Sequence, residues 1–154
     1  MSEGLKGDRQ RRRRVLKVLA AGVAMMTLRP AAATPENLAA ALRETFGDRP
    51  LRPGKVKLEL PRLAENGSVV PATVRVDSPM SEADHVAVIH LFAEKNPLPR
   101  MLEVRLGPHN GLAVVSCRVR LATTQVVTAV AEMNDGSLWS AVYEVEVTST
   151  GCGL

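Results

Sequence analysis

The stretch QVVTAVAEMNDGSLWSAVYEVEV, residues 125–147, decides the fold class because two runs that alternate in polarity flank a turn signal. Its turn NDGS contains an Asp-Gly pair, which is preferred in tight hairpins. Alternation with a period of two is typical of strands that bury one face. In the second run Trp139, Ala141, Tyr143, Val145 and Val147 form an apolar face opposite Ser140, Glu144 and Glu146. We therefore predict a hairpin whose second strand packs one face into a core.

Five more runs upstream show strand-like alternation. They are KVKLEL (55–60), VVPATVRV (69–76), HVAVIHLF (85–92), RMLEVRL (100–106) and AVVSCRVRL (113–121). Seven short strands between turn signals favour a sandwich. The turn ENGS (65–68) predicts a second hairpin, and Pro71 predicts that its strand lies at a sheet edge, because proline has no N–H to donate. The sequence thus predicts an all-β, antiparallel β-sandwich over residues 55–148.

A short helix is predicted before the sandwich. Thr34 is a candidate N-cap and Pro35 suits the first helical position. Leu38, Ala41, Leu42 and Phe46 follow at helical spacing, and Gly47 marks the end. Because the apolar residues share one face, we expect this helix to pack on the β-domain. Residues 34–54 are accordingly interpreted as an N-terminal helix and linker.

The positive charge is concentrated at the front of the chain. The formal net charge is +4, but residues 1–33 hold 8 Lys and Arg against 2 acids, so the remainder holds 12 bases and 14 acids. The arginines at 11–14 precede an apolar segment at 15–28, too short to span a bilayer comfortably, and then the small residues 31–33. This order favours a signal peptide over a nucleic-acid arm or a membrane anchor.

The pattern from Arg13 to Lys17 resembles a twin-arginine signal. We expect export by that route, cleavage after Ala33 and a mature N-terminus at Thr34 in the periplasm. Neither nucleic-acid binding nor membrane insertion after signal removal is expected.

Two cysteines remain in a compartment that oxidises thiols. Cys117 shares a strand face with Val115 and Val119, so we expect it to be a small buried hydrophobe facing the core. A disulfide with Cys152 is an open alternative, although it requires the two Cα atoms to lie within about 7 Å.

Cys152 lies in the tail TSTGCGL (148–154), between Gly151 and Gly153. The glycines do not shield the thiol and allow many backbone conformations, and residues 149–154 span at most about 20 Å when extended. We interpret them as a flexible C-terminal arm able to bring a thiol into a partner's pocket. A frayed end without a function is the alternative.

Few other residues suggest chemistry. His85, His90 and His109 are too few and too dispersed to predict a zinc site, so we expect no metal, and exposed or hydrogen-bonded histidines instead. No nucleophile elbow, phosphate-binding glycine loop or H-E-x-x-H motif is present. We therefore expect no cofactor, and we expect any catalysis to reside in partner proteins.

Four stretches together resemble the SoxY family, the sulfur-compound carriers of the periplasmic thiosulfate-oxidising Sox system. They are KVKLELPRLAENGSVVPATVRVDSPM (55–80), VAVIHLFAEKNPLPRMLEV (86–104), CRVRLATTQVVTAVAEMNDGSLWSAVYEVEV (117–147) and the terminal GCG (151–153). The resemblance implies an immunoglobulin-like sandwich and a non-enzymatic carrier that holds sulfur intermediates as covalent adducts on Cys152. Gly151 and Gly153 match the family's flexible flanks, whereas the double glycines usual there are reduced here and Leu154 follows.

The resemblance also implies partners. These are a SoxZ-like β-sandwich subunit, a haem-containing conjugating enzyme, a sulfate-releasing hydrolase and a sulfane-oxidising enzyme. The rival hypothesis is a periplasmic immunoglobulin-like binding module whose terminal cysteine only forms intermolecular disulfides. A thiol oxidoreductase is least favoured, because Cys152 has no second cysteine nearby in the sequence to resolve a mixed disulfide.

Overall fold

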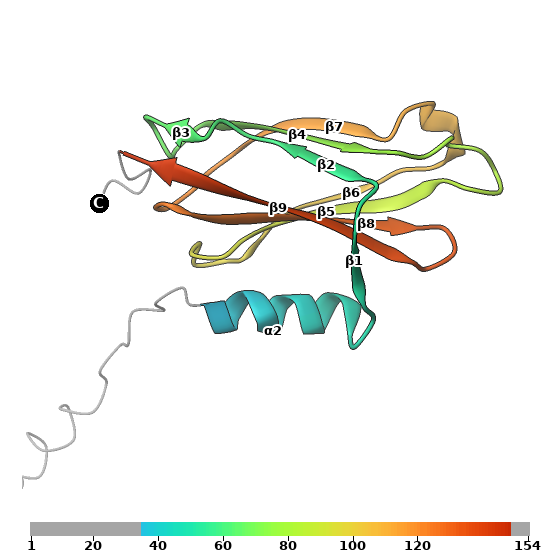
Figure 1. Cartoon of the computed structure of the whole chain (residues 1–154), viewed down its shortest axis with the longest axis horizontal. Helices are drawn as coiled ribbons and strands as arrows, with labels where there is room; N and C mark the ends of the chain where they lie inside the picture. The colour runs from blue at the N-terminus through green and yellow to red at the C-terminus, as the bar shows by residue number, and fades with distance from the viewer. Residues whose placement is uncertain (1–34, 149–154) are drawn as a thin grey trace, which may run out of the picture. The chain divides into compact units, whose positions relative to one another are not determined.

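The computed structural model describes residues 35–148, which form two β-sheets packed face to face and one helix against the larger sheet (Figure 1). The elements before the sandwich are α2 (Pro35–Phe46) and β1 (Leu51–Pro53). The remaining elements are β2 (Val56–Glu59), β3 (Leu63–Ala64), β4 (Val70–Val76), β5 (Val86–Ala93), β6 (Arg100–Arg105), the 3-10 helix η1 (Pro108–Asn110), β7 (Val114–Val119), β8 (Gln125–Met133) and β9 (Leu138–Val147). All seven predicted strands are present, and the immunoglobulin-like sandwich is confirmed.

The larger sheet has the order β1-β9-β8-β5-β6, and β3 also pairs with β9. The smaller sheet has the order β2-β4-β7. The neighbours among β9, β8, β5 and β6 are antiparallel, as are those in the smaller sheet, but β1 and β3 each run parallel to β9. The prediction of a purely antiparallel sandwich was therefore wrong at these two short strands. The segment interpreted as a linker contributes β1 to the sheet, because the chain after α2 runs along the edge of β9 before it crosses to the other sheet.

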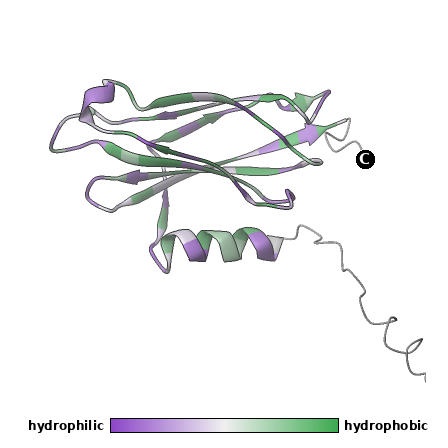
Figure 2. Ribbon diagram, turned by 180° about the vertical axis from the view of Figure 1, so that it is seen from behind, coloured by the Kyte–Doolittle hydropathy of each residue, from purple (hydrophilic) through white to green (hydrophobic). Residues whose placement is uncertain are grey.

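The core lies between the two sheets and is made of alternate residues of the facing strands. On β4 the inward residues Val70, Ala72, Val74 and Val76 are buried, while Pro71 and Arg75 are exposed. Figure 2 shows hydrophobic segments along the strands of both sheets. The predicted apolar face of β9 packs on this core through Trp139, Ala141, Tyr143, Val145 and Val147.

The β8–β9 hairpin forms where the sequence predicts it. Gly136 has a φ of 81°, a left-handed conformation that glycine adopts without steric cost. The Met133 N–H donates to the Ser137 carbonyl at 2.9 Å, and the Asp135 side chain accepts a hydrogen bond from the Ser137 N–H at 2.8 Å. Hydrogen bonds from the Ser137 side chain and from the Ser137 N–H keep the pKa of Asp135 below its usual value. The turn therefore sets the register of the two longest strands.

Helix α2 covers the outer face of the larger sheet. Phe46 is 4% exposed and packs with Phe92, Val130 and Leu138, and Leu38, Ala41 and Leu42 add to the same contact. Because this face is covered, β5 and β8 are buried on both faces and their burial does not alternate. The predicted helix and its packing are confirmed. The candidate cap Thr34 lies outside the described residues.

A buried polar network joins two loops at the end of the sandwich where β9 finishes. Asn96 donates to the Arg120 carbonyl at 2.8 Å, and its side-chain oxygen accepts from the Ala122 N–H at 3.0 Å and from Gln125 at 2.9 Å. The Gln125 oxygen in turn accepts from the Lys95 N–H at 2.7 Å. Asn96 and Gln125 thus hold the β5–β6 loop against the segment between β7 and β8. The backbone groups that they bind there are not paired with a neighbouring strand.

The prediction of an edge strand at Pro71 and that of a hairpin at ENGS need correction. Pro71 lies in β4, the central strand of the smaller sheet, and not in an edge strand. Proline is accepted there because β2 ends at Glu59, opposite Thr73, so β4 has a neighbour on only one side at Pro71. The ENGS turn does not close a hairpin, because the chain before it forms β3 on β9 while the chain after it enters the other sheet.

Cys117 is half-buried and not fully buried as predicted. Its side chain does pack against the core, as the alternation indicates. However, β7 is an edge strand, so one flank of the thiol is not covered by a neighbouring strand. Partial burial still raises the pKa of the Cys117 thiol.

His90 differs from the expectation that the histidines would be exposed or hydrogen-bonded. It is 4% exposed, and neither ring nitrogen has a hydrogen-bond partner. Its ring meets the ring of Phe46 edge-on at 5.0 Å and stacks on Phe92 at 6.1 Å, so it is enclosed between α2 and the sheet. Burial lowers the pKa of His90, although the carboxylates of Glu103 and Glu132 oppose this shift.

We predict that Asn96→Ala lowers the free energy of unfolding by about 2–4 kcal/mol. The substitution leaves the partly buried carbonyl of Arg120 and N–H of Ala122 without their side-chain partner, at about 1–2 kcal/mol each. Asn110→Ala is the matched control: it removes one solvent-exposed hydrogen bond, which the Asn110 side chain accepts from the Gly107 N–H, and should cost about 1 kcal/mol or less. Urea denaturation measures both, and equal costs would contradict the role of the network.

We also predict that His90 makes the domain less stable in mild acid. Its pKa is lower in the folded state than the ordinary 6.5, so below that pH the unfolded chain binds more protons and the folded state loses stability. In His90→Leu the free energy of unfolding should fall less between about pH 8 and pH 5 than in the wild type. Parallel pH profiles would contradict this prediction, since His85 and His109 are common to both proteins.

Candidate functional site

The predicted site residues Cys152, Gly151 and Gly153 lie outside the described residues, as does the rest of the arm, 149–154. The structure instead shows what holds the base of the arm. Thr148 is the last described residue and directly follows β9. The contacts of β9 near its end therefore determine where the arm starts.

One side of this base is held by β3. Leu63 and Ala64 pair with Glu146 and Val147 in parallel register. The Glu146 N–H donates to the Arg62 carbonyl at 2.9 Å, and the Thr148 N–H donates to the Ala64 carbonyl at 3.1 Å. Strand β3 lies beside the end of β9 in Figure 1. These bonds extend the sheet to the last residue before the arm.

The other side is held by Thr124, which lies just before β8. The Thr124 hydroxyl accepts a hydrogen bond from the Val147 N–H at 2.9 Å and lies 3.5 Å from the Val147 carbonyl, to which it can donate. Thr124 thus takes the place of a ladder partner, because the β8–β9 pairing ends at Gln125 and Val145. The end of β9 is consequently fixed from both sides.

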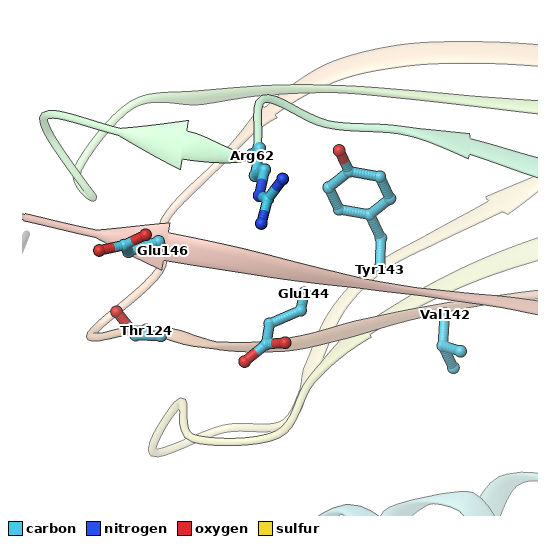
Figure 3. A pocket seen from close by; sticks show the side chains of 6 residues that line it. All are labelled: Arg62, Thr124, Val142, Tyr143, Glu144 and Glu146. Carbon is cyan, nitrogen blue, oxygen red and sulfur yellow. The ribbon is translucent and has the colours of Figure 1, made fainter.

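A cavity of about 540 Å³ lies beside this base (Figure 3). It is lined by Arg62, Thr124, Val142, Tyr143, Glu144 and Glu146. One guanidinium and two carboxylates give the lining a net charge of −1, which is unsuited to holding an anionic sulfur adduct. None of these six residues is a cysteine or a histidine, so the lining contains neither a thiol nor an imidazole.

The histidines do not assemble a metal site. His85 contacts the Ser81 carbonyl through Nδ1 at 3.0 Å, His90 is enclosed under α2, and His109 lies in η1. Among residues 35–148 there is no group of three or more His, Cys, Asp or Glu side chains placed to hold a metal ion. Within the same range no helix is long and apolar enough to cross a membrane.

The two cysteines belong to different parts of the chain. Cys117 lies in the smaller sheet, whereas the arm that carries Cys152 leaves from the larger sheet. The raised pKa of Cys117 keeps its thiol protonated and therefore less nucleophilic. Cys152 lies outside the described residues, so the disulfide between Cys117 and Cys152 stays an open alternative.

Several residues that hold the base of the arm were not identified from the sequence. Arg62, Ala64 and Thr124 hold the base of the arm, and Asn96 and Gln125 brace the loops next to it. The only signal for β3 is two residues long, too short for periodicity to be read. Asn96 and Gln125 do lie in the EKNP and RVRLATTQ stretches that resemble the family, and the structure gives both stretches a physical role.

The chain is similar to known proteins in both sequence and fold. Residues 42–152 match the family described as "Sulfur oxidation protein SoxY". The sulfur carrier protein SoxY from Chlorobium limicola f thiosulfatophilum is 30% identical in sequence, with a TM-score of 0.63 over 75% of this chain and 100% of that one. A search of curated protein sequences finds no match.

Two superoxide reductases share the sandwich at lower identity. The neelaredoxin from Ignicoccus hospitalis is 23% identical with a TM-score of 0.54, covering 61% of this chain and 80% of its own. The enzyme from Nanoarchaeum equitans is 14% identical with a TM-score of 0.53, covering 62% and 100%. At such identity the likeness is one of fold alone. The family match and the similarity to a solved carrier protein lead to one assignment: the chain belongs to the SoxY family of sulfur oxidation proteins.

Proposed function

We propose that this protein is a covalent carrier of sulfur intermediates in thiosulfate oxidation, which it holds as adducts on Cys152. The observation that carries the proposal is that the family match runs to residue 152, four residues beyond the last one anchored in the sheet. Four extended residues span at most about 14 Å. A partner enzyme would therefore have to lie against the end of the sandwich in order to bind the arm in its active site.

The chemistry of the cycle requires only a thiolate from this chain. In the first step the Cys152 thiolate and thiosulfate form an S–S bond and release two electrons, which the haem-containing conjugating enzyme accepts. In the second step a hydrolase adds water to the terminal sulfonate, releasing sulfate and two protons and leaving a persulfide anion on Cys152. A sulfane-oxidising enzyme then acts on the persulfide.

We propose that catalysis resides in the partner enzymes, because the steps above require only a thiolate from this chain. Cys117 is unsuited to carry cargo, because its thiol is half-buried in β7 and has a raised pKa. We further propose a SoxZ-like β-sandwich as the permanent partner, no resident cofactor, and a periplasmic location reached by the twin-arginine route.

The rival function is an immunoglobulin-like binding module whose Cys152 only forms intermolecular disulfides. It shares the fold and the cysteine near the C-terminus with the carrier. The two differ in the mass of the native protein, because a carrier gains sulfane and sulfonate groups and a binding module gains only another thiol compound.

We predict that Cys152→Ser abolishes adduct formation and thiosulfate-dependent turnover in the reconstituted system. A serine hydroxyl is a far weaker nucleophile than a thiolate and cannot hold a persulfide. Cys117→Ser is the matched control and should keep both activities, with a modest loss of stability from its partly buried hydroxyl. Intact-mass spectrometry after incubation with thiosulfate and the partner enzymes measures the additions. Adducts on the Cys152→Ser protein would refute the carrier function.

We predict that the mature protein begins at Thr34. The small residues 31–33 follow the apolar segment at the distance a signal peptidase requires. N-terminal sequencing of protein from the periplasmic fraction measures this, and replacing Arg13 and Arg14 with Lys should trap the precursor. A mature form that retains residues 15–28 would exclude cleavage at this position.

A further inference from the structure

His90 is an ionisable side chain enclosed at the contact between α2 and the larger sheet. It is 4% exposed, and neither ring nitrogen has a hydrogen-bond partner among residues 35–148. Buried polar groups without partners are few in proteins, and each one weakens the packing that encloses it. We propose that His90 acts as an acid-sensitive release for α2: protonation of its ring frees the helix from the larger sheet while the two sheets stay packed together.

Phe46, the last residue of α2, covers the His90 ring. It meets the imidazole edge-on with 5.0 Å between the ring centroids, and Phe92 stacks on the imidazole at 6.1 Å. A neutral imidazole tolerates these apolar surroundings, whereas an imidazolium carries a charge and has two N–H groups that need acceptors. Both N–H groups lie in the plane of the ring, so stacking on Phe92 does not supply an acceptor. Water can reach the two nitrogens once Phe46 moves away.

The charged groups nearest to His90 do not offset its burial. Burial is the main cause of its lowered pKa, and the guanidinium groups of Arg100 and Arg105 on β6 act in the same direction. The carboxylates of Glu103 on β6 and Glu132 on β8 oppose the shift of the pKa without cancelling it. The docked helix therefore favours the neutral ring.

Both carboxylates already have cationic partners. Glu103 lies 4.0 Å from Nδ1 of His90, beyond hydrogen-bond distance, and 2.9 Å from the Arg105 guanidinium. Glu132 pairs with Arg49 at 2.6 Å. The ionisable side chains of α2 itself are exposed; they are Glu36, Arg43 and Glu44. In the docked arrangement a protonated His90 consequently has no acceptor within hydrogen-bond distance among the described residues.

The contact that holds α2 is separate from the core of the sandwich. The cluster beneath the helix and the cluster between the sheets share no residue. The buried members of the cluster beneath the helix are Phe46, Phe92, Val130 and Leu138. Gly47, with a φ of 64°, follows the helix, and β1 then pairs with β9. The helix can therefore leave the sheet, tethered by β1, without opening the core.

Acid shifts the equilibrium toward the released helix. The pKa of His90 is lower with α2 docked than the ordinary value of 6.5, so release is coupled to the uptake of a proton. Below about pH 6.5 the ratio of released to docked helix rises by up to about tenfold per pH unit, until the pH reaches the lowered pKa. Release uncovers Phe92, Val130 and Leu138, which are buried while α2 is docked.

Amide hydrogen exchange of the mature protein, followed by mass spectrometry from about pH 7.5 to pH 5.0, tests the release. After correction for the intrinsic effect of pH on exchange, the protection of α2 should fall by about fivefold or more over this range. It should depend only weakly on added urea, because release exposes little surface. The protection of β8 should be higher and should fall steeply with urea, because exchange there requires global unfolding. Equal protection and equal urea dependence would mean that helix and sandwich open as one unit, and the proposal would fail.

His90→Leu should abolish the response, because no proton is taken up when the helix leaves. The protection of α2 should then be the same at both ends of the pH range. His109→Leu is the matched control, since His109 is exposed in η1, and this variant should respond as the wild type does. A response that persists in His90→Leu, or that the wild type lacks, overturns the proposal.

A second measurement does not depend on how leucine packs at position 90. Phe46→Ala removes the cover, so an NMR titration of the imidazole should give His90 a pKa closer to 6.5 than in the wild type. The same titration in both proteins would contradict the proposed release. None of these measurements involves Cys152, so adduct formation decides the carrier function separately. If that function also holds, the protons released by hydrolysis of its adduct would promote the release of α2.

Discussion

The pairing of β9 with three other strands is the constraint on which the rest of the structure depends. It pairs with β8 along eight residues, with β1 at its start and with β3 at its end. The two short partners run parallel to it, and the chain passes along β9 as β1, crosses to the smaller sheet as β2 and returns to β9 as β3. This arrangement fixes where α2 joins the sheet, where the two sheets connect and where the arm leaves.

Periodicity and turn chemistry predicted the seven main strands, the β8–β9 hairpin and the packing of α2, because each depends on contacts that a local pattern reflects. They failed where contacts between distant segments determine the position of a residue or the formation of a strand. Pro71 is tolerated in a central strand because β2 is short, and β3 forms only because the end of β9 needs a partner. Cys117 was placed on the correct face, but its exposure depends on β7 being an edge strand, which alternation cannot show.

For the candidate site, the sequence contributed the cysteine and its glycine neighbours, whereas the structure contributed the base that carries them. Thr124, Arg62 and Ala64 act through single hydrogen bonds between segments far apart in the chain, and such bonds leave no local pattern. His90 was also missed, because its enclosure requires α2 and the sheet to meet over it. Long-range contacts thus define the surroundings of a site whose chemistry is local.

The fixed end of β9 has a consequence for how a carrier shares its cargo. If Cys152 carries the cargo as proposed, it is tied only four residues beyond the anchored Thr148, and an enzyme at that end of the sandwich would meet it at an effective concentration on the order of millimolar or more. Each enzyme in a relay then needs only weak affinity for the carrier body. Weak affinity permits rapid dissociation, and the next enzyme in the sequence can take its place without competing for a tightly held complex.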